Sequence, residues 1–128
     1  MNSDLRRSQR YTDFLPISVI VNRGQQKISG PYSARITDIS HHGACLLLTR
    51  VMLDSFHIFH STREDDSQTL QLIVSINRDI EDITVNARPI WLDSTQMDDI
   101  KVFKMGVDFT EKLDDYRLKE LNKRIKLL

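Results

Sequence analysis

The chain lacks several features that would assign it to a class at once. It has one cysteine, Cys45, so it cannot form an internal disulfide, and this fits a reducing compartment. No apolar run approaches the roughly 20 residues that a membrane-spanning helix needs. The polar, charged N-terminus also lacks the hydrophobic region of a signal peptide. We therefore expect a cytoplasmic protein with no membrane insertion.

An excess of positive charge is also missing. Lysine plus arginine and aspartate plus glutamate both number 18, so the formal net charge at pH 7 is zero. Proteins that hold nucleic-acid polymers by general electrostatics are normally basic. Aromatic residues, on which single-stranded bases would stack, make up only 7% of the chain. A nucleic-acid polymer is therefore a poor candidate partner, and any anion site has to be local.

Groupings of catalytic or metal-binding residues are equally sparse. His41 and His42 are adjacent, so on an extended segment their side chains point in opposite directions. His57 and His60 have no cysteine or carboxylate partner at a convincing spacing, and no P-loop or dinucleotide fingerprint occurs. Cys45 lies in an apolar run and is interpreted as a small buried hydrophobic residue rather than a nucleophile. We expect no metal, no cofactor and no enzymatic activity.

What the chain does contain is a series of short strand-like runs. Its 128 residues, of which 40% are hydrophobic and 28% charged, suit one globular domain. Strands are predicted at 17–21, 32–37, 44–49, 70–76, 83–91 and 102–109, where β-branched and apolar residues gather between turn residues. Residues 50–67 are expected to form a long crossing loop with some packed side chains. This pattern favours a small antiparallel barrel.

Two local signals refine the prediction. Pro89 cannot donate a ladder hydrogen bond, so its strand should lie at an edge or be bulged there. Asp114 is a good helix N-cap, with Leu113 and Leu118 at the positions of a hydrophobic staple. A C-terminal helix should pack on the barrel through one face at helical spacing, made of Leu118, Leu121, Ile125 and Leu128.

The first candidate binding cluster lies near the start of the chain. Residues 1–13 contain almost no apolar side chains, and we expect them to form a flexible arm in front of a domain at 14–128. This arm carries Arg6, Arg7 and Arg10. A guanidinium group is planar and always charged, so it suits phosphates and the O6/N7 edge of guanine. A solvated basic tail is the alternative interpretation.

The second cluster is Asp38-Ile39-Ser40-His41-His42-Gly43, which must turn or bulge between two strands. Asp38 can accept from the N–H groups on the Watson–Crick edge of guanine, and Ser40 is small enough to lie against a phosphate. Gly43 permits positive φ and a close backbone approach to a ligand. An ordinary turn, in which Asp38 and Ser40 satisfy local amides, explains the same residues. Together, the two clusters indicate one site for an anion and a base.

The ordered pair of Arg-x-x-x-Arg at 6–10 and Asp-x-Ser-x-x-Gly at 38–43 resembles the signature of the PilZ domain family. Arg-Pro-Ile-Trp at 88–91 and Met-Gly-Val-Asp-Phe at 105–109 extend the resemblance, which covers roughly residues 5 to 125. It implies a mainly β fold: a small antiparallel six-stranded PilZ-like β-barrel with a C-terminal α-helix and a flexible N-terminal arm.

The resemblance also implies a ligand, the bacterial second messenger cyclic di-GMP. The implied contacts come from Arg6, Arg7, Arg10, Asp38, Ser40 and Gly43, with Trp91 either close to the ligand or packed in the core. Leu5 stands where some relatives have a further arginine, and this favours one ligand per protomer.

The function implied is a receptor or adaptor that changes conformation on binding cyclic di-GMP and regulates a partner protein, in motility, biofilm or exopolysaccharide control. The alternative is a ligand-independent interaction module of motility or secretion machinery that keeps the PilZ fold.

Overall fold

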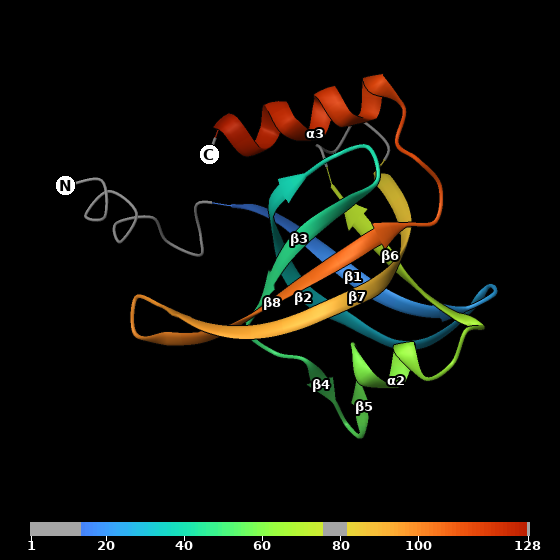
Figure 1. The fold of residues 1–128 in the computed structure, drawn as a ribbon. Coiled ribbons are helices and arrows are strands. Elements are labelled where there is room, and N and C mark those ends of the chain that lie inside the picture. The colour runs from blue at the N-terminus through green and yellow to red at the C-terminus, as the bar shows by residue number, and fades with distance from the viewer. Residues whose placement is uncertain (1–13, 76–81, 128) are drawn as a thin grey trace.

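The structure, a computed structural model, describes residues 14–75 and 82–127 (Figure 1). In chain order the elements are β1 (Leu15–Arg23), β2 (Gln26–Ile39), β3 (Gly43–Leu48), β4 (Met52–Leu53), β5 (Phe56–His57), α2 (His60–Arg63), β6 (Gln68–Val74), β7 (Ile83–Met97), β8 (Ile100–Phe109) and α3 (Asp115–Leu127). Six strands close into an antiparallel barrel in the order β1-β2-β3-β8-β7-β6. The predicted fold class, a mainly β, PilZ-like six-stranded barrel with a C-terminal helix, is confirmed. The expected arm lies outside the described residues.

Strand pairing extends several elements beyond their predicted ends. β2 begins at Gln26 rather than near Tyr32 because its polar start pairs with the end of β1, as in Arg23 with Gln26. β7 continues past Trp91 to Met97, paired with β8 in a hairpin that projects from the barrel (Figure 1). The predicted loop at 50–67 was wrong in part, since it contains β4, β5 and α2. These elements have two to four residues, too few to show a periodic pattern in a sequence.

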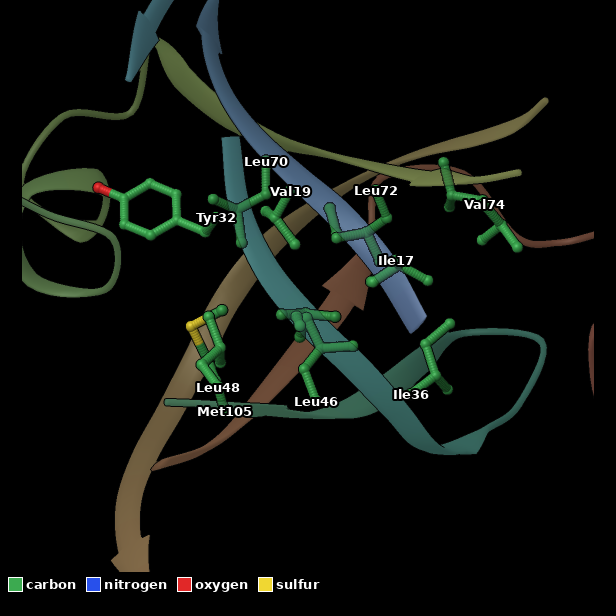
Figure 2. Close-up of a cluster of buried hydrophobic side chains, with 14 of the residues drawn as sticks. Ile17, Val19, Tyr32, Ile36, Leu46, Leu48, Leu70, Leu72, Val74 and Met105 are labelled. Atoms are coloured by element: carbon green, nitrogen blue, oxygen red, sulfur yellow. The ribbon is translucent and has the colours of Figure 1, made fainter. Parts of the chain in front are cut away.

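The barrel interior follows from simple alternation. Along β1, the side chains of Leu15, Ile17, Val19 and Val21 are buried. Successive residues of a strand face opposite sides, so alternate positions fill the interior. Figure 2 shows such side chains from β1, β2, β3, β6 and β8 meeting inside the barrel, among them Leu46 from β3.

The C-terminal helix is capped as predicted. Of its predicted packing face, Leu118, Leu121 and Ile125 lie against the core, and Leu128 lies outside the described residues. The Arg117 N–H donates to Asp114 Oδ1 over 2.7 Å, and this hydrogen bond lowers the pKa of Asp114. Leu113 and Leu121 are buried, and α3 packs against β2 across one end of the barrel (Figure 1). Within the described residues, neither helix has the length and apolar character needed to cross a membrane.

A histidine caps the short helix α2. His57 Nδ1 accepts hydrogen bonds from the N–H groups of Phe59 and His60, each over 3.1 Å. Burial, followed by the nearby charge of His60, lowers the pKa of His57. The neutral imidazole is therefore the form that holds the beginning of α2.

Acidification is expected to weaken this cap. The unfolded chain takes up the proton on His57 first, so the stabilisation is complete above the unfolded pKa of about 6.5 and is lost as the pH falls through the lower folded pKa. Urea denaturation at about pH 7.5 and about pH 5.5, which bracket the range where histidine changes charge, measures the loss. In His57→Asn the amide oxygen can accept the same hydrogen bonds without titrating. Wild type should lose more stability than this variant, and equal losses would contradict the prediction.

Candidate functional site

Two rows of residues cross the barrel at one place, the first over four neighbouring strands and the second over three of them. The register partners of the first row, from β2 through β3 and β8 to β7, are Asp38, Cys45, Gly106 and Trp91. Those of the second row, from β3 through β8 to β7, are Gly43, Asp108 and Arg88. The row between them, Ile39, Ala44, Val107 and Pro89, packs toward the interior. Because side chains alternate along each strand, the first and second rows share the outer face.

A β-bulge in β2 places Asp38 on this outer face. The register shifts between Ile36 and Asp38, which leaves Thr37 as the extra residue. Ile36 is buried, and regular alternation would bury Asp38 as well. The bulge moves the interior position to Ile39 instead, so the carboxylate of Asp38 is exposed.

A second bulge does the same for Trp91. The register of β7 shifts between Pro89 and Trp91, as the sequence predicted at Pro89, with Ile90 as the extra residue. Pro89 is buried, and regular alternation would bury Trp91 too. After the bulge Trp91 is 44% exposed, and Leu92 packs against the core in its place. Of the two interpretations left open for Trp91, the structure excludes burial inside the barrel.

The indole of Trp91 lies against the backbone of Gly106. A Cβ added at Gly106 would be 2.8 Å from Trp91 Cδ1 and still closer to Nε1 and Cε2. Only glycine therefore leaves the ring this position over the sheet.

The residues of both rows, apart from Arg88, line a cleft of about 290 Å³. Its walls include all four predicted site residues that the structure describes, Asp38, Ser40, Gly43 and Trp91. His42, Cys45, Ile90, Gly106 and Asp108 also contribute. The structure thus brings together one end of β2, the following turn, β8 and the bulge of β7. Arg6, Arg7 and Arg10 lie outside the described residues.

The described lining of the cleft is acidic. It carries the carboxylates of Asp38 and Asp108 and, among the described residues, no lysine or arginine. Within this part of the chain the Asp38 side chain makes no hydrogen bond or ion pair, although it is well placed to accept one. The cleft therefore presents acceptors to a ligand's N–H groups, while an anionic ligand would need cations from elsewhere.

The turn that follows β2 uses Ser40 locally. Its N–H donates to Gly43 O over 2.8 Å, and its hydroxyl accepts from the His42 N–H over 3.3 Å. This is the ordinary turn that the sequence left as an alternative, and it explains Ser40 without a ligand. The turn also holds the start of α3, because His41 O accepts from the Leu113 N–H and His41 Nε2 lies 2.8 Å from Asp115 Oδ1. Among described side chains, no metal-binding cluster occurs here or elsewhere.

Gly43 is required for a reason that the sequence did not predict. It is not among the glycines with positive φ, which in the described chain are Gly24 and Gly30. A Cβ at Gly43 would instead collide with the carbonyl oxygen of Val107 on β8. The close approach at Gly43 is therefore to a neighbouring strand.

The sequence interpretation missed Cys45, Gly106 and Asp108. Cys45, expected to be buried, is half-buried and free in the cleft. Asp108 could have been found from Met-Gly-Val-Asp-Phe, since a residue two positions after Gly106 faces the same side of a strand.

Comparisons with known proteins find the fold and not a close relative. No family model matches the sequence, and no curated protein matches it. The crystal structure of the Borreliella burgdorferi PlzA protein in complex with c-di-GMP is similar, with a TM-score of 0.53 and 9% sequence identity. The likeness covers 99% of this chain and 48% of that one, so this chain spans about half the length of its match. At this identity the likeness concerns the fold.

Proposed function

We propose that this protein is a receptor for cyclic di-GMP, bound between the N-terminal arginines and the cleft on the outer face of β2, β3, β8 and β7. The observation that carries the proposal is the convergence of Asp38, Ser40, Gly43 and Trp91 on one cleft. The fold shared with a protein solved in complex with c-di-GMP supports the same ligand.

The chemistry of the cleft suits a guanine base. Asp38 accepts from the N–H groups of the Watson–Crick edge, and the exposed ring of Trp91 offers a surface for stacking. Cyclic di-GMP, with two guanines and two phosphates, is larger than this cleft. One guanine with its nearby phosphate would occupy the hollow, and the rest of the ligand would face the arm.

The phosphates need cations that the described cleft does not supply. β1 begins beside the end of β2 that carries Asp38. Phe14 O accepts a hydrogen bond from Arg35 Nη1 over 3.0 Å, and Leu15 pairs with Ile36. Arg10 is four residues before Phe14, so their Cα atoms are at most about 14 Å apart. The arginines of the arm therefore precede the start of β1 closely enough to reach this end of β2, and we assign the phosphates to them.

The same geometry suggests how ligand binding would regulate a partner protein. Ligand binding would hold Arg6, Arg7 and Arg10 against the barrel, change the surface around the turn at 40–43 and alter the affinity for a protein partner. Motility, biofilm formation and exopolysaccharide production in a bacterium are the processes we associate with such a receptor. One ligand per protomer is expected, because the uncharged Leu5 stands where some relatives have a further arginine.

Calorimetric titration of the whole chain with cyclic di-GMP tests the proposal, with cyclic GMP as the control. Micromolar binding corresponds to roughly 8 kcal/mol, which a few arginine and stacking contacts can supply. Trp91 is the only tryptophan, so its fluorescence should change with the same midpoint. No heat and no fluorescence change would reject the receptor and favour the ligand-independent interaction module.

A further inference from the structure

The bulge that exposes Trp91 is held by a side chain from another part of the chain. Arg63 Nη1 donates to Pro89 O and to Ile90 O, each over 3.1 Å. Consecutive carbonyls of a regular strand point to opposite sides, so one donor can reach both only where a bulge has turned them together. β6 pairs with β7 only as far as Ala87, so the ladder with β6 has ended before these carbonyls.

Arg63 itself is anchored to the barrel through α2. The neighbouring Ile58 and Thr62 are fully buried, and the Arg63 guanidinium carbon lies 5.7 Å from the centroid of the Phe59 ring. A guanidinium over an aromatic ring gains a cation–π attraction. Contacts within α2 and with the barrel therefore help to hold the Arg63 guanidinium near the bulge.

The Arg63 contact also borders the candidate cleft. A second hollow, of about 340 Å³, is lined by Arg63, Arg88 and Asp66. It shares Ile90 and Asp108 with the cleft. A change at Arg63 would therefore reach the cleft through the two residues at which the hollows join.

We propose that Arg63 is a positioning residue for the cleft: by holding both carbonyls of the bulge, it keeps the indole of Trp91 over Gly106. Without the two hydrogen bonds, β7 can relax around Ile90 and the ring leaves the sheet. The segment at 50–67, which the sequence predicted only as a crossing loop, thereby acquires a role in shaping the cleft. Only the consequence for ligand affinity rests on the proposed function.

The fluorescence of Trp91 without ligand is the primary test. Arg63→Met removes both donors at similar length, and we expect a red-shifted emission and stronger acrylamide quenching. Gly106→Ala supplies the reference for a displaced ring, because its Cβ would occupy the place of the indole. Arg63→Lys keeps a cationic donor and should resemble wild type. Arg50→Met, at an exposed arginine with no partner among the described residues, is the matched control.

The outcomes separate the positioning role from general destabilisation and from the proposed ligand. A folded Arg63→Met protein with the emission and quenching of wild type would overturn the inference. Should that variant not fold, Arg63→Gln, whose amide is too short to reach both carbonyls, replaces it in the same comparison. If wild type binds cyclic di-GMP, Arg63→Met should bind roughly fivefold or more weakly through lost stacking. If wild type does not bind it, the proposed function fails, and the fluorescence still decides the role of Arg63.

Discussion

Gly43→Ala is expected to lower the free energy of unfolding by about 2 to 3 kcal/mol, the upper range for overpacking a site that cannot yield. The added Cβ would meet the Val107 carbonyl oxygen, a backbone atom within the β3–β8 pairing of the closed barrel. No rotamer change can relieve this clash, so the strands must separate near Gly43 and Asp108. Both residues line the cleft, and we expect ligand binding to be lost with the same substitution.

Gly24→Ala is the matched control for this prediction. Gly24 has φ of +59°, and an added Cβ there would have no atom within 4 Å. Its cost comes only from placing a side chain in the left-handed region, about 1 kcal/mol. Denaturant unfolding of both variants measures the difference. If Gly43→Ala proves no less stable than Gly24→Ala, the close approach of β8 to β3 is not the reason for glycine at position 43.

The second large effect is expected for the arm. Arg10→Ala should weaken cyclic di-GMP binding roughly 5-fold to 150-fold, since a bidentate arginine–guanine contact contributes about 1–3 kcal/mol. The acidic lining of the described cleft makes this loss more severe, because no lysine or arginine there can replace the missing charge. Calorimetric titration at fixed ionic strength gives the affinities.

Two further variants sharpen the interpretation of that result. Asp38→Asn keeps the size of the side chain but offers the guanine N–H groups one acceptor fewer, so a similar loss is expected. Arg50→Ala removes one positive charge at the far end of β3 from Gly43 and should leave the affinity unchanged. Wild-type affinity in both Arg10→Ala and Asp38→Asn would place the ligand elsewhere on the protein.

The sequence by itself determined the elements whose signals are local. Alternation along β1, the N-cap at Asp114 and the bulge expected at Pro89 each depend on a few consecutive residues, and the structure reproduces them. The resemblance also selected Asp38, Ser40, Gly43 and Trp91. The structure places these four residues in one cleft, and their contact with a ligand stays a prediction.

Tertiary structure alone decided how these residues meet. The first row places Asp38, Cys45, Gly106 and Trp91 side by side, and the four come from strands whose register is set by closing the barrel around its core. One residue more or less in a strand exchanges its inner and outer faces, so the bulges at Thr37 and Ile90 determine which side chains form the site. The hydrogen bonds from Arg63 to the bulge and the close approach of Val107 to Gly43 likewise join segments that are distant in sequence. No pattern within a few consecutive residues can predict such contacts.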